Sequence, residues 1–135
     1  MLGCILPQKN WAQVTLPYSQ NFEGSTSEWT LQSSSPNSWI VGTATNNGGS
    51  KGLYVSNNGT SNAYSDDPNG ANVITASFDV DLTNVTNAQL QFDWKCIGEA
   101  LFDYGELFIE YGGTEYRISS QFEFQNSATY STKTV

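Results

Sequence analysis

The residues that could carry chemistry in this chain are carboxylates and a thiol, because the sequence contains no histidine. Histidine is the usual general base at neutral pH and the commonest metal ligand. The remaining catalytic possibility is a carboxylate pair of the kind that hydrolyses glycosides. Glu106 and Glu110 share one side of an expected strand, but four residues of strand span ~13 Å, and glycosidase carboxyls lie roughly 5 to 9.5 Å apart. The spacing therefore disfavours a carboxylate-based glycoside hydrolase, and we expect no catalytic residue.

The thiol of Cys96 is a weak candidate nucleophile. A reactive cysteine needs a neighbouring base to remove its proton, and Cys96 falls on the apolar side of its expected strand. We therefore expect a small core residue at this position. The second cysteine, Cys4, lies in a segment that we expect to be removed, so no disulfide is predicted.

Oxygen-rich turns are the candidate metal sites. Asp66 and Asp67 begin one such turn, and Asn57 and Asn58 lie in another. Ca²⁺ takes about six to eight oxygen ligands from carboxylates, amides and backbone carbonyls, which turns of this composition can supply. The same residue types also form Asx turns that cap strand ends, and the residues alone leave both interpretations open.

Aromatic residues outside regular alternation are the candidate ligand contacts. Aromatic faces beside Asn and Asp side chains can hold a sugar ring or a peptide, although most aromatic residues in strands pack in the core. Trp29 and Tyr64 lie in irregular polar stretches, so we predict that they are exposed and contact a ligand. Trp94 is in phase with Leu90 and Phe92 and is predicted to be core.

The segments that position these residues have a hydrophobic period of two, which is typical of half-buried strands. The clearest strand is 89–96, with inward-facing Leu90, Phe92, Trp94 and Cys96. A second is expected at 73–82, with inward-facing Ile74, Ala76, Phe78, Val80 and Leu82. A third is expected at 104–111, with Leu107, Ile109 and Tyr111 on one side and Glu106, Phe108 and Glu110 on the other.

Turn-forming residues separate these segments. The pair Gly112-Gly113 predicts a hairpin that joins 109–111 to 115–117. Shorter strands are expected at 39–42, 53–56, 115–119 and 122–124. Short strands at regular intervals, with no helical period, predict an all-β fold, either a sandwich or a jelly roll.

Length and charge limit the partners. A chain of 135 residues fits a single domain. Its 13 acidic and 5 basic side chains give a net charge of −8, which repels phosphate backbones and anionic lipid headgroups. We therefore expect no nucleic-acid partner and no membrane insertion.

The first twelve residues resemble the end of a secretory signal peptide, with the small residue Ala12 at the cleavage position. The predicted organisation is a signal-peptide remnant at 1–12 followed by one domain at 13–135. The predicted location is extracellular, either secreted or at the cell surface.

Five ordered blocks between Val14 and Tyr111 form a specific pattern. They are LPYSQNFE (16–23), NSWIVG (37–42), LYVSNNG (53–59), FDWKCIGE (92–99) and FDY (102–104). Together they resemble the choice-of-anchor J domain, a family similar to the cleaved adhesin domains of gingipain-type bacterial proteases and, more distantly, to MAM domains. The resemblance implies a jelly-roll β-sandwich of two antiparallel sheets. The family pattern continues beyond Val135, so we expect this jelly roll to be truncated at its C-terminus and to lack its last strands.

The resemblance also implies a structural Ca²⁺ near the N-terminal strand. Glu23 matches the family's acidic position after Phe22, and Asn58 matches a loop position that is often acidic. Asp66 and Asp67 match by neighbourhood only. The implied metal ligands are thus Glu23, Asn58, Asp66 and Asp67.

Residues and resemblance together favour a non-catalytic binding or adhesion module of a secreted or surface bacterial multidomain protein. Its expected partner is a host or surface protein or a glycan, and the module itself is expected to be monomeric within a larger chain. The alternative is a structural spacer appended to a secreted peptidase or other hydrolase.

Overall fold

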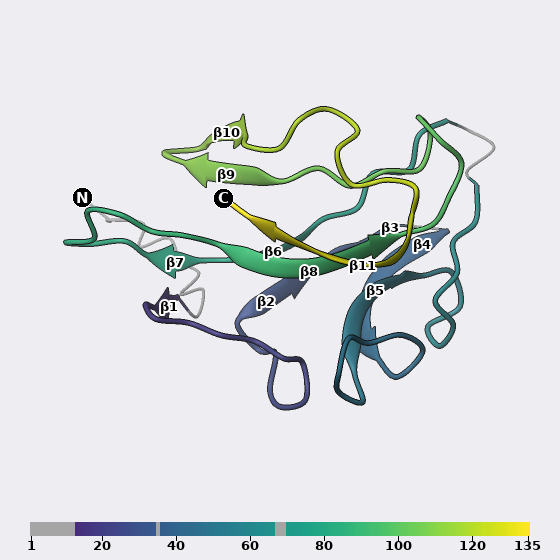
Figure 1. Cartoon of the computed structure of the whole chain (residues 1–135), viewed down its shortest axis with the longest axis horizontal. Helices are drawn as coiled ribbons and strands as arrows, with labels where there is room; N and C mark the ends of the chain where they lie inside the picture. The colour runs from purple at the N-terminus through teal and green to yellow at the C-terminus, as the bar shows by residue number, and fades with distance from the viewer. Residues whose placement is uncertain (1–12, 35, 67–69) are drawn as a thin grey trace, which may run out of the picture. The chain divides into compact units, whose positions relative to one another are not determined.

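The computed structural model describes residues 13–34, 36–66 and 70–135 and confirms the all-β fold. These residues form eleven strands and no helix (Figure 1). The chain divides into two compact units, Met1–Asn84 and Val85–Val135. The predictions made for 1–12, including the signal-peptide remnant and Cys4, lie outside the described residues, as does Asp67.

Seven strands belong to the first unit. Their bounds are β1 (Val14–Thr15), β2 (Trp29–Leu31), β3 (Ser33–Ser34), β4 (Asn37–Gly42), β5 (Gly52–Ser56), β6 (Ala76–Phe78) and β7 (Val80–Asp81). Strands β3, β4 and β5 form an antiparallel sheet in that order, and β2 pairs antiparallel with β6. The β1–β7 pair is parallel, which departs from the predicted pair of purely antiparallel sheets. The strands expected at 39–42 and 53–56 are confirmed as parts of β4 and β5.

Tyr54 on β5 is the buried aromatic residue of this unit, with 5% of its surface exposed. Its hydroxyl donates to the carbonyl of Thr60 at 3.0 Å, so the polar end of the ring is satisfied inside the protein. Gly42 is required beside it, because a Cβ at that position would collide with the Tyr54 hydroxyl. The ring therefore connects both strands of the β4–β5 pair to the loop that follows β5.

The strand predicted at 73–82 is interrupted at Asp79. Strand β6 pairs with β2, whereas β7 pairs with β1, so the chain changes partner between them. Ile74, Ala76, Phe78 and Val80 are partly buried, as predicted, but Leu82 is exposed. Its predicted inward position was wrong because the strand ends at Asp81, whose carboxylate accepts a hydrogen bond from the Thr83 amide at 2.8 Å and closes a turn.

The second unit contains β8 (Gln91–Cys96), β9 (Phe108–Tyr111), β10 (Thr114–Arg117) and β11 (Ser127–Thr134). The strand predicted around 89–96 is confirmed by β8, and its alternation is confirmed for Phe92 and Trp94. Both rings contact Phe124 edge-on, with centroid separations of 5.6 and 5.0 Å. Phe124 is 7% exposed, so these three rings form the core of the unit.

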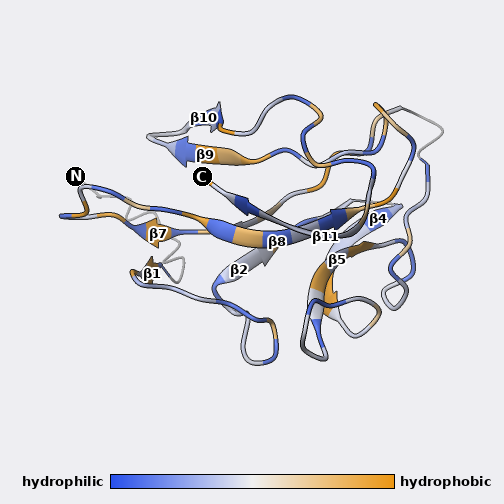
Figure 2. Cartoon of the chain, viewed as in Figure 1, coloured by the Kyte–Doolittle hydropathy of each residue, from blue (hydrophilic) through white to orange (hydrophobic). Residues whose placement is uncertain are grey.

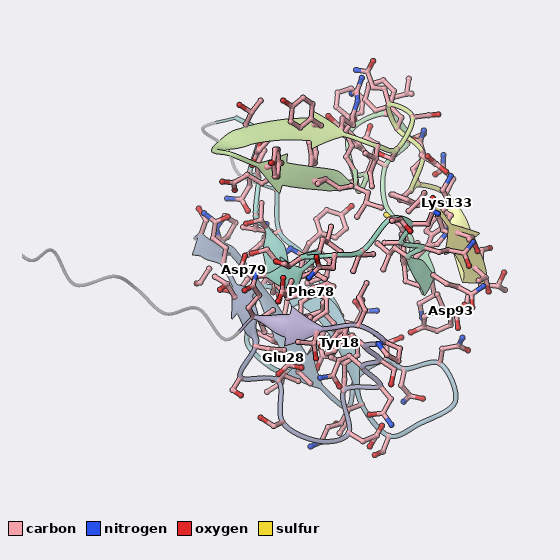
Figure 3. All side chains as sticks on the ribbon, turned by 90° about the vertical axis from the view of Figure 1, so that its left-hand side faces the viewer. Tyr18, Glu28, Phe78, Asp79, Asp93 and Lys133 are labelled. Carbon is pink, nitrogen blue, oxygen red and sulfur yellow. The ribbon has the colours of Figure 1, made fainter. Side chains whose placement is uncertain are left out.

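Strand β11, which pairs antiparallel with β8, was not predicted. Its sequence, SATYSTKT, lacks apolar alternation, because much of its stabilisation is polar. The Thr132 hydroxyl donates to Asp93 on β8, and the Lys95 ammonium lies 4.9 Å from the centre of the Tyr130 ring. Asp93 and Lys133 can be located on this strand pair in Figure 3.

The segment 122–124 was predicted as a strand, and this was wrong. Phe124 forms only an isolated antiparallel bridge, in which the Gly105 amide donates to the Phe124 carbonyl at 2.8 Å. The close approach favours glycine, because a Cβ on Gly105 would lie 3.3 Å from the Cβ of Phe124. The core ring is thereby tied to the chain that leads into β9.

The predicted hairpin is confirmed. Strands β9 and β10 are joined through Gly112 and Gly113, which have φ angles of 60° and 77°. Positive φ at both central positions is the requirement of a two-residue type I′ turn. The strand expected at 104–111 is confirmed over 108–111, and both of its sides are exposed there, with Ile109 and Tyr111 at 51% and 80%.

Replacing the core ring of the second unit should destabilise it strongly. We expect Phe124→Ala to lower the free energy of unfolding by about 3–5 kcal/mol, because it removes a buried ring and leaves a cavity. Urea denaturation followed by tryptophan fluorescence would measure this, since Trp94 contacts Phe124. The matched control is Phe102→Ala, whose ring is 75% exposed and whose loss should change the stability by less than about 0.5 kcal/mol. Equal effects of the two substitutions would contradict this account of the core.

Candidate binding surface

The β9–β10 hairpin presents two chemically different faces to solvent. Paired residues in an antiparallel ribbon share a face, and successive residues alternate. The register therefore places Ile109, Tyr111, Thr114 and Tyr116 on one face, here called the aromatic face. The opposite face, here called the acidic face, carries Glu106, Phe108, Glu110, Glu115 and Arg117. Figure 2 shows the hydrophobic part of β9 in orange, next to its hydrophilic end.

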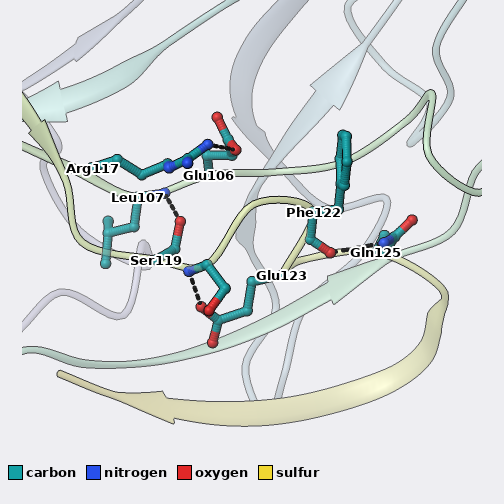
Figure 4. Close-up of polar contacts among 8 residues, drawn as sticks. Glu106, Leu107, Arg117, Ser119, Phe122, Glu123 and Gln125 are labelled. Atoms are coloured by element: carbon teal, nitrogen blue, oxygen red, sulfur yellow. Dashed lines mark hydrogen bonds and ion pairs between the residues drawn. The ribbon is translucent and has the colours of Figure 1, made fainter.

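The base of the hairpin is anchored by hydrogen bonds within its own unit (Figure 4). The Leu107 amide donates to the buried Ser119 hydroxyl at 3.0 Å, and the Ile118 amide donates to the Leu107 carbonyl at 2.9 Å. On the following loop, the carboxylate of Glu123 accepts from the Ser120 amide at 2.8 Å and pairs with the Lys133 ammonium. The hairpin thus has a fixed base and exposed strands.

The Glu123 carboxylate is held in its charged form. Its pKa is lowered by the hydrogen bond from Lys133 and then by the hydrogen bond from the Ser120 backbone amide. The ion pair between Glu123 and Lys133 fastens the loop between β10 and β11 to strand β11.

Glu106 and Glu110, the carboxylates that the sequence offered for glycoside hydrolysis, have different surroundings. Glu106 forms an ion pair with Arg117 across the hairpin, at 2.8 Å. Glu110 lies directly opposite Glu115 in the register.

The thiol of Cys96 is half-buried and close to the backbone of Asp103, to whose carbonyl it donates at 3.8 Å. Burial raises the pKa of this thiol, and the negative charge of Asp103 raises it further. A raised pKa lowers the fraction of reactive thiolate at neutral pH, in keeping with the small core residue expected from the sequence.

Glu23, the first predicted calcium ligand, is already bound by protein donors. Its carboxylate accepts hydrogen bonds from the Ser50 amide at 2.7 Å, the Lys51 amide at 2.8 Å and the Ser50 hydroxyl. These bonds lower its pKa, the Ser50 hydroxyl most and the two backbone amides next. A side chain at Gly49 would collide with this carboxylate. Glu23 therefore fastens the 49–51 loop, a role that the sequence did not indicate because its partners are 27 and 28 residues away.

Asn58, the second predicted ligand, forms an Asx turn. Its side-chain oxygen accepts from the Thr60 amide at 3.0 Å, the Ser61 amide at 2.9 Å and the hydroxyls of Ser56 and Thr60. Of the two interpretations that the sequence left open for this turn, the capping geometry is the one seen. Asp66 is exposed, and Asp67 lies outside the described residues.

Glu23 and Asn58 are each bonded within a different loop. Glu23 binds the Ser50 and Lys51 amides, which precede β5, whereas Asn58 follows the end of β5 and binds the Thr60 and Ser61 amides. In the described ranges there is also no cluster of three or more Cys, Asp or Glu side chains that could hold a metal.

Trp29 was predicted to be exposed, and this was wrong because it begins strand β2 instead of lying in an irregular stretch. Its ring packs on Phe78 at 4.6 Å and on Phe22 at 5.5 Å between centroids. Its indole N–H donates to the Tyr18 hydroxyl at 2.9 Å. Trp29 is therefore partly buried in an aromatic cluster, and its proposed contact with a ligand stays a prediction.

The Tyr18 hydroxyl in this cluster in turn donates to Glu28 at 2.7 Å, as can be followed in Figure 3. Burial raises the pKa of Tyr18, and the bond to Glu28 raises it further. The same bond is the main cause of the lowered pKa of Glu28.

Tyr64, the other predicted ligand contact, is exposed. Its neighbour Ser65 is fixed by the buried Asn37, whose side-chain amide donates to the Ser65 carbonyl and accepts from the Ser65 amide, both at 2.9 Å. The loop that carries Tyr64 is thus anchored on β4. The exposure of Tyr64 was predicted, whereas the aromatic face was not, because alternation separates the two sides of 104–111 without showing which of them is exposed.

Comparisons with protein-family models, with curated proteins and with solved structures found no match to this chain. Among the described residues, no helix is long and apolar enough to cross a membrane.

The bond network of Glu23 should make stability depend on pH. The pKa of Glu23 is lower in the folded chain than its ordinary value of 4.5. The ionised carboxylate therefore stabilises the fold above that value, and this contribution is lost as the pH falls through the lowered pKa. We expect Glu23→Gln to flatten the pH dependence of the unfolding free energy between about pH 6 and about pH 3. Glu99→Gln, on an exposed loop, is the control and should keep the pH dependence of the wild-type chain. The same pH dependence of the unfolding free energy in the wild-type chain, Glu23→Gln and Glu99→Gln would refute the role of Glu23.

Calcium binding at Asp66 and Asp67 is a separate prediction. Titration calorimetry with CaCl₂ should release or absorb heat, and the melting temperature should be higher in Ca²⁺ than in chelator, because a ligand bound only by the folded state stabilises it. Asp66→Asn should remove both effects, whereas Glu23→Gln should keep them. Unchanged melting of the wild-type chain in chelator would count against a structural metal.

Proposed function

We propose that this chain is a non-catalytic extracellular binding or adhesion module, and that a protein or glycan ligand contacts the aromatic face of the β9–β10 hairpin. The observation that carries this proposal is the exposure of Ile109, Tyr111 and Tyr116, at 51%, 80% and 55%, on one face of an anchored ribbon. Contiguous exposed apolar side chains mark interaction surfaces.

Tyrosine suits such a surface for physical reasons. It offers a large, rigid contact area with only two side-chain torsions to fix, and its hydroxyl forms hydrogen bonds at the edge of the contact. A structural spacer has no need to expose these side chains to water. The exposed hairpin therefore favours a binding role over the spacer alternative.

The finer assignments belong to the same proposal. We propose a jelly-roll arrangement and membership of the choice-of-anchor J type, supported by the all-β strand content and by the five sequence blocks. An extracellular location and a monomeric module within a larger bacterial protein agree with the signal-like start and the acidic charge. The net charge of −8 favours neutral or basic partners.

Binding through the aromatic face can be tested on a glycan array and an array of immobilised extracellular proteins. We expect selective binding by the wild-type chain, and at least about a tenfold loss of affinity in Tyr111→Ser/Tyr116→Ser, because each such anchor contributes about 1–2 kcal/mol to an interface. The matched control is Phe102→Ala, which removes an exposed ring outside the hairpin.

Two outcomes would contradict the proposal. Binding of the wild-type chain to nothing above background on both arrays would favour a spacer. Turnover of a polysaccharide by the isolated chain, abolished by Glu106→Gln, would establish a glycoside hydrolase instead.

A further inference from the structure

The outer edge of β10 is the feature that the proposed function does not use. Strands β9 and β10 form a two-stranded sheet, so among the described residues no third strand pairs with β10. The Ile118 amide points toward β9, because it donates to Leu107. Backbone direction alternates along an antiparallel strand, so the N–H and C=O groups of Glu115 and Arg117 point to the outer edge. This edge can accept the backbone of an added strand.

The acidic face next to this edge carries uncompensated negative charge. Arg117 is paired with Glu106 at 2.8 Å. That leaves Glu110 and Glu115, which lie directly opposite each other and are both exposed. Like charges in directly opposed positions destabilise a strand pair, and a basic side chain beside Glu115 would offset part of this negative charge.

Along the hairpin, side chains alternate between the aromatic face and the acidic face with a period of two residues. The side chains of an added strand alternate with the same period. A strand added to β10 would place alternate side chains beside Tyr116 and Thr114 on the aromatic face, and the others beside Glu115 on the acidic face. The first set meets apolar surface and the second meets carboxylates. The complementary partner is therefore an extended segment in which apolar and basic residues alternate.

We propose that the outer edge of β10 binds an extended peptide segment with alternating apolar and basic residues by adding it to the sheet. This inference rests on the proposed binding function and assigns its partner to a chemical class, namely a basic, β-forming protein segment. Main-chain hydrogen bonds to Glu115 and Arg117 would hold the strand, and its alternating side chains would select it.

The probe is the synthetic peptide Val-Lys-Val-Lys-Val-Lys, titrated into the full chain by calorimetry and by amide chemical shifts. We expect saturable binding that weakens with added salt, and no binding of Val-Glu-Val-Glu-Val-Glu. Glu115→Gln should weaken binding about two- to fivefold, the range of one exposed charge pair, and Glu115→Lys should weaken it further. Glu99→Lys changes the net charge by the same amount as Glu115→Lys, on a loop outside the hairpin, and should have little effect on peptide binding.

Two N-methylated peptides separate edge pairing from binding to a face. In an added strand only alternate amides point toward β10, so methylating all lysine amides or all valine amides should abolish binding in one peptide and retain it in the other. If the peptide adds antiparallel with a lysine opposite Glu115, its lysine amides point toward β10, so the lysine-methylated peptide should not bind. Retention by both peptides, or loss by both, would overturn strand addition.

The remaining outcomes distinguish this inference from the proposed function. If the basic peptide does not bind but the arrays show binding that Tyr111→Ser/Tyr116→Ser removes, the inference fails and the binding module stands. Concentration-dependent dimerisation of the free chain in sedimentation, abolished by Glu115→Lys, would assign the edge to a second copy and also overturn the inference.

Discussion

Each of the two compact units is organised around one aromatic side chain shielded from water. Tyr54 and Phe124 are the buried hydrophobic residues in the part of the chain that the structure describes. Such small cores bury little apolar surface. A polar group buried beside them loses its bonds to water and costs free energy unless the protein supplies a hydrogen bond in their place. Asn37, Ser56 and Ser119 are buried, and no buried side-chain nitrogen or oxygen atom of the described residues lacks a hydrogen-bond partner. The loops and the hairpin base are positioned by these bonds as much as by apolar packing.

This dependence on polar bonds explains how the exposed surfaces keep their shape. Asn37 holds the loop that carries Tyr64, Glu23 holds the 49–51 loop, and Ser119 holds the base of the β9–β10 hairpin. Each contact joins residues that are distant in sequence or lie on different elements. A chain of short strands can therefore present defined loops.

Local alternation and turn chemistry predicted part of this structure. The phase of Phe92 and Trp94 predicted β8, and Gly112-Gly113 predicted the hairpin, because both signals depend on neighbouring residues. Alternation also separated the two faces of β9, but it could not show that both of them are exposed. Strand β11 was missed because its pairing with β8 is long-range and polar. The partners of Glu23 and the ring contacts of Trp29 were equally beyond local reasoning, since they form only after distant segments meet.

The glycine pair at the hairpin tip also has a consequence for the order of folding. Tyr111 and Thr114 pair across only two residues, whereas Gln91 and Thr134, which meet in the β8–β11 pair, are 43 residues apart. The entropy lost on closing a loop grows with its length, and contacts between near neighbours form faster than distant ones. We expect the ribbon to assemble early and the pairing of the chain's last strand to be the slow, nucleation-limited step of the second unit.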